Sequence, residues 1–89
     1  MANNKSAKKR IEIAKRNRLQ NLYYKTSVRT LTKLFFKTLK QTPESNEKLQ
    51  TILNSIYSFL DKGTKKNVFH RNTAARKKAR LASALSSNS

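Results

Sequence analysis

The sequence predicts an all-α protein: a three-helix antiparallel bundle with a long, projecting basic N-terminal helix. Apolar residues recur at steps of three and four, the spacing of one helical face. The 89 residues include a single Gly and a single Pro, too few turn formers for a many-stranded β fold. A chain of this length fits one small domain, which we expect to cover residues 1–89.

The first predicted helix ends near residue 40 and has two parts. In residues 19–40 an apolar stripe with steps of 4, 3, 4 and 4 predicts a buried face. Its members are Tyr24, Val28, Leu31, Phe35 and Leu39. In residues 1–18, the basic extension, the charges point in every direction around the axis. This part has no face to bury, so roughly 15 residues should project beyond two shorter helices of about 30 Å each.

The second predicted helix covers residues 43–66. Thr42 is a candidate N-cap, Pro43 suits the first helical position, and Glu44 would lie near the positive end of the helix dipole. The strongest apolar stripe in the chain follows, so this helix should form the centre of the core. It comprises Leu49, Ile52, Leu53, Ile56 and Leu60, with Tyr57 and Phe59 on its flanks. Gly63 weakens the helix, and Asn67 can adopt the left-handed conformation that ends one.

The third predicted helix covers residues 68–85 and is followed by a tail, 86–89, that should fray. Ala75, Ala79 and Ala82 recur at steps of 4 and 3, beside Leu81 and Leu85. We therefore expect these alanines to face the core and to allow close approach to the neighbouring helices.

The charge of the chain predicts a polyanionic partner. There are 21 Lys and Arg against 4 Asp and Glu, a formal net charge of +17. Residues 1–40 carry +11, residues 41–61 carry −2 and residues 62–89 carry +8. Such a surplus destabilises the free compact state by self-repulsion. The two ends should therefore face the partner while the middle segment supports them.

Phosphate binding needs Lys and Arg side chains that reach the backbone, with Asn, Ser or Thr as neutral donors. One such cluster contains Asn3, Lys5, Ser6, Lys8, Lys9 and Arg10, and a second contains His70, Arg71, Asn72, Arg76, Lys77 and Arg80. Along the first helix the candidates are Lys15, Arg16, Arg18, Lys25, Arg29 and Lys33.

An enzyme is not expected, because the few carboxylates share no catalytic motif with the single His70. His70 is better interpreted as a hydrogen-bonding or capping residue than as a metal ligand, and no cofactor is predicted. No apolar run is long enough to span a membrane, and the apolar stripes are accounted for by mutual packing. We expect no small-molecule substrate and no homo-oligomer.

The alternative to an RNA-binding protein is a basic-helix DNA-binding or architectural protein. A zipper would need about three or four heptads, and the first helix offers barely two. A long helix that is basic all round suits insertion between several helices of a folded RNA. The aromatic residues Tyr23, Phe36 and Phe69 stay open between packing and stacking on bases.

Three parts of the sequence resemble one known family. They are MANNKSAKKR at the start, Asn21 with Arg29 and Thr30, and DK at 61–62 with KNVFHRNTAARKKARL at 66–81. Over nearly its whole length the chain is similar to the S20 family of bacterial-type small-subunit ribosomal proteins. The resemblance implies a structural constituent of the small ribosomal subunit. Such a protein binds small-subunit (16S-type) rRNA directly, at the 5′ domain and the penultimate long helix, and stabilises its packing during assembly.

The resemblance also implies the contact residues. It assigns RNA contact to the N-terminal cluster, and at the C-terminal end to Lys66, His70, Arg71, Asn72, Arg76 and Arg80. Asn21 is a further predicted contact residue. Asn67 departs from the family, which has Gly there. Because Asn tolerates the left-handed conformation next best, we expect the turn to be retained.

Composition suggests the compartment. Lys outnumbers Arg 14 to 7 and the chain has 9 Asn, as an A+T-rich coding sequence would favour. The family motif begins at Met1 with no transit extension. We expect a plastid-encoded protein of ribosomes in the chloroplast stroma, with the cytoplasm of an A+T-rich bacterium as the alternative.

Overall fold

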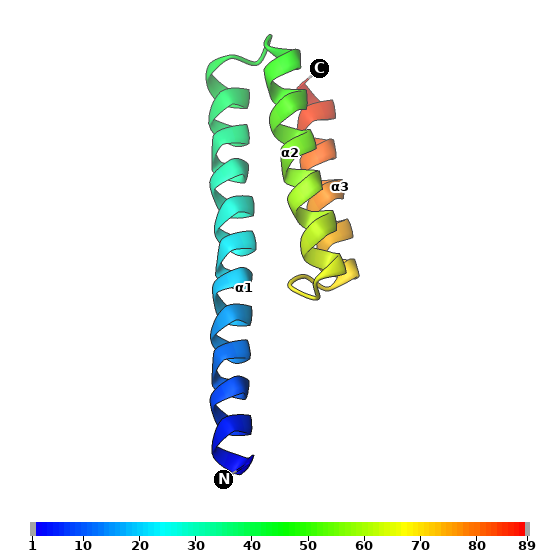
Figure 1. Cartoon of the computed structure of the whole chain (residues 1–89). Helices are drawn as coiled ribbons and strands as arrows, with labels where there is room; N and C mark the ends of the chain where they lie inside the picture. The colour runs from blue at the N-terminus through cyan, green and yellow to red at the C-terminus, as the bar shows by residue number, and fades with distance from the viewer. Residues whose placement is uncertain (1, 89) are drawn as a thin grey trace.

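The computed structural model describes residues 2–88, and side chains within residues 6–87. It consists of three helices, α1 (Ala2–Gln41), α2 (Asn46–Lys65) and α3 (Arg71–Asn88) (Figure 1). The chain reverses direction after α1 and again after α2, so consecutive helices are antiparallel (Figure 1). The Cα atoms extend over 64 × 22 × 14 Å. The predicted all-α bundle with a long first helix is confirmed.

The N-terminal part of α1 contributes no buried side chain to the core. Every side chain of residues 6–19 is exposed, and we call this segment the N-terminal rod. Figure 1 shows the start of α1 extending well past the ends of α2 and α3. Ile11, Ile13 and Leu19 are 67%, 42% and 58% exposed, so even the large apolar residues of the rod are not part of the core. The predicted projection of α1 is confirmed.

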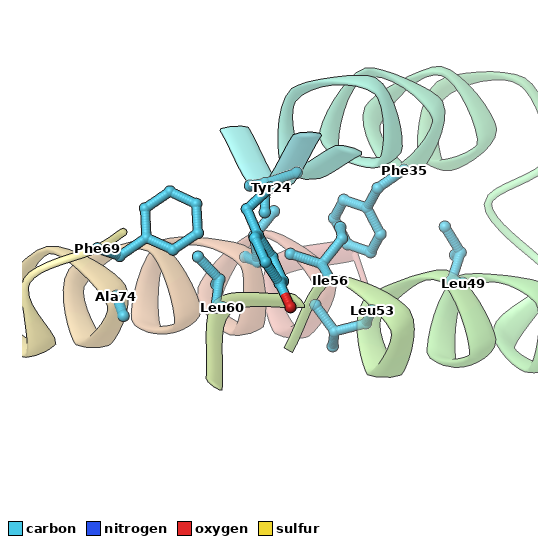
Figure 2. Packing of buried hydrophobic residues seen from close by; sticks show 10 residues of the cluster. Tyr24, Phe35, Leu49, Leu53, Ile56, Leu60, Phe69 and Ala74 are labelled. Atoms are coloured by element: carbon cyan, nitrogen blue, oxygen red, sulfur yellow. The ribbon is translucent and has the colours of Figure 1, made fainter. Parts of the chain in front are cut away.

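The core lies where the second half of α1 packs against α2. Phe35 from α1 and Leu49, Ile56 and Leu60 from α2 are completely buried, and Figure 2 shows Phe35 and Tyr24 pointing from α1 toward α2. Each fully buried side chain of this size contributes about 1.5–3 kcal/mol through burial. The core cluster is Tyr24, Val28, Phe35, Leu49, Leu53, Ile56, Leu60, Phe69, Ala74 and Leu81. The apolar stripes predicted for the first two helices are therefore the ones that are buried.

The start of α2 differs from the prediction. The helix begins at Asn46, and Pro43 lies in the preceding turn. Thr42 does not cap α2, because its backbone N–H and its hydroxyl both donate to the carbonyl oxygen of Thr38, at 2.8 and 3.1 Å. Thr42 thus completes the end of α1. The cap position of α2 falls to Ser45, whose side chain makes no capping hydrogen bond.

The connection from α2 to α3 is a Schellman motif. Asn67 has a φ of 63°, the Asn67 N–H donates to Thr64 O at 3.1 Å, and the Val68 N–H donates to Gly63 O at 2.7 Å. These two bonds satisfy two of the last four carbonyl groups of α2. The left-handed conformation predicted for Asn67 is confirmed, and the turn is retained without a glycine at this position.

Gly63 has a packing role that the sequence did not indicate. A Cβ atom at this position would lie 2.5 Å from Cδ2 of Phe69. The missing side chain therefore lets the Phe69 ring lie directly against α2. This contact folds the start of α3 back toward the core.

The third helix begins later and continues further than predicted. α3 starts at Arg71, because Val68 and Phe69 belong to the turn, and it continues to Asn88 through the tail that was expected to fray. Ser89 lies outside the described residues. His70 caps the helix: its Nδ1 accepts a hydrogen bond from the Asn72 N–H at 3.1 Å. The capping interpretation of His70 is confirmed.

The predicted core face of α3 was wrong. Ala75, Ala79 and Ala82 are exposed, whereas Ala74 and Leu81 are buried. The reason is that α3 packs mainly against α2 and hardly touches α1. One neighbour can cover only a narrow stripe, and the larger apolar area of Leu81 determines which stripe is buried.

Polar contacts of Tyr57 and Lys78 hold α3 on α2. The Tyr57 hydroxyl donates to the carbonyl oxygen of Lys78 at 3.1 Å. The Lys78 ammonium lies 5.5 Å from the centre of the Tyr57 ring and forms an ion pair with Asp61. Lys78 is therefore engaged within the bundle, in contrast to its neighbour Lys77, which is exposed.

Candidate nucleic-acid interface

A groove of about 560 Å³ lies between α1 and α3. It exists because α2 packs against both of these helices while they hardly touch each other. We call it the α1–α3 groove. Basic residues from both helices line it: Lys25, Arg29 and Lys33 of α1, Lys77 and Arg80 of α3, and His70 just before α3. The groove thus brings together six predicted contact residues that are up to 55 positions apart in the sequence.

The groove also has an apolar lining and two hydroxyl groups. The apolar lining consists of Phe36, Val68, Phe69 and Leu81, and the hydroxyls are those of Thr32 and Thr73. The Thr32 hydroxyl donates to the carbonyl oxygen of Val28 at 2.7 Å, which leaves its lone pairs available as acceptors. The lining is therefore amphipathic, with cations beside apolar and aromatic surface.

The helical repeat explains why these residues meet. Lys25, Arg29 and Lys33 follow steps of four along α1, beside the buried stripe that contains Tyr24 and Val28. On α3, Thr73, Lys77 and Arg80 likewise border the buried stripe, which contains Ala74 and Leu81. The groove therefore lies between two helix flanks, one on α1 and one on α3, each next to the stripe that packs against α2.

The rod continues the basic surface of the groove. Lys8, Lys15, Arg18 and Lys25 follow steps of 7, 3 and 7, which places them on one side of α1. From Lys8 to Lys33, the last cation of α1 in the groove, this side measures about 38 Å at 1.5 Å per residue. The rod therefore leads into the groove along a single helix face.

The other predicted contact residues of the rod lie elsewhere around its axis. These are Ser6, Lys9, Arg10 and Arg16, and all four are exposed, as are Lys8, Lys15 and Arg18. The side chains of Asn3 and Lys5, also predicted as contacts, lie outside the described side chains. Because every side chain of the rod is exposed, phosphates can approach it from several sides.

Five predicted contact residues are exposed but lie outside the α1–α3 groove. They are Asn21, Lys66, Arg71, Asn72 and Arg76. Arg76 lines a second recess of about 420 Å³ on α3, together with Thr73, Lys77 and Arg80. Its Nε donates to the carbonyl oxygen of Asn72 at 3.4 Å, which orients the guanidinium along the helix.

No carboxylate lines the α1–α3 groove within the described part of the chain. Asp61 pairs with Lys78 on α3, and Glu44 and Glu47 lie near the start of α2. The positive charge of the groove is thus not neutralised by the protein itself. This arrangement favours binding of a phosphate backbone.

The three aromatic residues left open by the sequence have different environments. Phe69 is 8% exposed and belongs to the core, whereas Phe36 is 41% exposed and lines the groove. Tyr23 is 58% exposed and contacts the rings of Tyr24 and Phe59 edge to face. Sequence reasoning did not identify the groove residues Thr32, Thr73 and Val68. Their only signal was a position next to a buried stripe, which many surface residues share.

Within residues 2–88 no group of three His, Cys, Asp or Glu side chains is placed to hold a metal ion. None of the helices there combines the length and apolar character that crossing a membrane requires.

The fold and the charge distribution define a class: small helical proteins whose exposed cations form an extended polyanion-binding surface. Within this class the sequence identifies a family. The profile of the family Ribosomal protein S20 matches residues 2–86, and the chain belongs to this family.

Individual relatives match over almost their full lengths. The chain is 66% identical over 90 residues to small ribosomal subunit protein bS20c of Phaeodactylum tricornutum, covering 96% of this chain and 97% of that protein. It is 59% identical over 90 residues to bS20c of Trieres chinensis, with the same coverage. It is 50% identical over 92 residues to bS20 of Synechocystis sp., covering 98% of this chain and 95% of that protein.

Proposed function

We propose that this protein binds small-subunit rRNA directly, through phosphate contacts along the rod and the α1–α3 groove, and stabilises the packing of the RNA during assembly. Its family makes it a structural constituent of the small ribosomal subunit. The proposed RNA partners are the 5′ domain and the penultimate long helix. The proposed contact residues are those predicted from the sequence, with the six groove residues at the centre.

The observation that carries this proposal is the exposed rod. Residues 6–19 carry cations on several sides and bury nothing within the protein. Isolated helices of this length are marginal in water. A folded RNA can surround such a helix with phosphates, whereas a flat anionic surface reaches one side only. This geometry supports RNA as the partner.

The ribosomes that contain this protein are those of plastids. The relatives in Phaeodactylum tricornutum and Trieres chinensis have names with the suffix c, the form given to plastid proteins, and they share 66% and 59% identity with the chain. The bacterial relative from Synechocystis sp. shares 50%. The identities agree with the plastid location suggested by composition.

Titration of the full-length protein with a small-subunit rRNA fragment over a range of salt concentrations tests the proposal. If about eight phosphates are neutralised, log affinity should fall with log salt with a slope of about −6 to −7. The complex should also survive an excess of duplex DNA or of anionic lipid vesicles.

Three outcomes would contradict the proposal. A slope near −1 would mean that phosphate contacts contribute little. Displacement of the rRNA by duplex DNA would favour the alternative, a basic-helix DNA-binding or architectural protein. Displacement of the rRNA by vesicles would favour an anionic membrane surface as the partner.

A further inference from the structure

We propose that the α1–α3 groove binds one unpaired nucleotide, with the base stacked on Phe36 and the adjacent phosphates on the cationic rim. The inference rests on the proposed function, because it takes RNA as the partner. It goes beyond that function by assigning contact with a base, whereas the rod and the rim of the groove account only for contact with phosphates.

Phe36 has the properties of a stacking platform. It is 41% exposed although it is a large apolar residue, and it lines a groove that contains five Lys and Arg residues. Its ring packs edge to face against Phe35, with 5.4 Å between ring centres and 79° between planes. Because Phe35 is completely buried, this contact holds the exposed ring in place. Exposed aromatic rings beside cations are typical of sites for unpaired nucleotides.

The second aromatic ring of the groove is already engaged. The Lys77 ammonium lies 5.7 Å from the centre of the Phe69 ring, and the backbone of Gly63 approaches the same ring closely. Phe69 is only 8% exposed. Phe36 is therefore the ring in this groove that has surface available to a base.

The groove supplies cations for the phosphates of a nucleotide and hydrogen-bonding groups for the edge of its base. The cations form what we call the rim. Lys25, Arg29 and Lys33 face Lys77 and Arg80 across the groove and can neutralise phosphates on either side. For the base edge the groove offers His70 and the hydroxyl of Thr73. Because His70 Nδ1 accepts from the Asn72 N–H, the neutral ring carries its proton on Nε2 and presents a donor there.

The size of the groove also fits a nucleotide. Its volume of about 560 Å³ lies in the range of about 300–1,000 Å³ that is usual for sites of small organic ligands. A base within a duplex is paired and stacked on its neighbours, so it cannot reach the aromatic lining. The occupant should therefore be a bulged or looped nucleotide. Binding of phosphates alone would leave the exposed Phe36 ring without a role.

Two RNA hairpins of equal charge test the inference: one fully paired, and one with a single bulged adenosine. The full-length protein should bind the bulged hairpin about 5- to 100-fold more tightly, the range expected for stacking of one base on an aromatic ring. Phe36→Leu keeps the apolar volume but removes the ring, and should reduce this ratio to about one without changing affinity for the paired hairpin. Phe36→Tyr should keep the ratio.

Tyr23→Leu provides the matched control, because Tyr23 is an exposed aromatic residue of α1 outside the groove. This variant should bind both hairpins as the parent does. In the parent protein, the NMR signals of the Phe36 ring protons should shift upfield with the bulged hairpin and not with the paired one.

The outcomes separate this inference from the proposed function. Equal binding of the two hairpins, an unchanged ratio in Phe36→Leu, or Phe36 ring signals that do not respond to the bulge would each overturn the nucleotide site while binding to small-subunit rRNA persists. Failure to bind the rRNA fragment itself would overturn the proposed function, and the nucleotide site with it.

Discussion

Ile56→Asp is expected to abolish the folded bundle. Ile56 is completely buried in the core, where α2 faces α1, and the described core offers no buried polar or charged partner for a carboxylate. Burying an unpaired charge costs several kcal/mol, which approaches the total stability of about 5–15 kcal/mol that is typical of a domain. We therefore expect a loss of at least about 4 kcal/mol.

The measurement is urea unfolding of the free protein followed by circular dichroism. Ile56→Asp should show no cooperative transition, whereas Ile56→Val should lose only about 0.5–1.5 kcal/mol. Asn54→Asp adds the same charge at an exposed position of α2 and should unfold like the parent. An Ile56→Asp variant with the parent's transition would show that α1 and α2 do not pack through this residue.

Replacing Lys8, Lys9 and Arg10 together with Ala is expected to weaken rRNA binding by about 30- to 300-fold, because each lost cation removes a charge-assisted contact with a phosphate. The salt slope should become shallower by about 2 to 3. Stability of the bundle should be nearly unchanged, since the three side chains are exposed in the part of α1 that extends past α2 and α3 (Figure 1).

The matched control replaces Lys48, Lys62 and Lys65 with Ala. These residues are exposed on α2, outside the α1–α3 groove, and their removal lowers the net charge by the same amount. The control should bind rRNA several-fold more tightly than the rod variant. Equal losses for the two variants would mean that only total charge matters. If the rod variant loses stability together with rRNA binding, Lys8, Lys9 and Arg10 are needed for the fold and not specifically for RNA contact.

Local sequence signals were sufficient for the buried faces of the first two helices and for the second turn. A stripe with steps of three and four identifies the buried face of a long helix, because Phe35, Ile56 and their neighbours have one large surface to pack against. Asn67 was predictable because few residue types adopt a positive φ. The exposed rod was predictable because it has charge in all directions and no apolar stripe.

Features that depend on the arrangement of the helices were not predictable in this way. The face of α3 was misassigned because α3 has one main neighbour, which only the assembled bundle reveals. The start of α2 was misassigned because Thr42 hydrogen-bonds back into α1, so a competing local bond replaced the expected cap. The groove depends on how far α1 and α3 stand apart. The sequence identified the cations of the groove as contact residues, but it did not show that they face each other.

Amide hydrogen exchange, measured with and without the rRNA fragment, tests most directly whether the rod depends on RNA. In the free protein at low salt, amides of residues 6–19 should exchange rapidly, while those around Phe35 and Ile56 should be protected. Binding of the rRNA fragment should protect residues 6–19 as well. Slow exchange of the rod without RNA, or rapid exchange of the rod within the complex, would contradict the account.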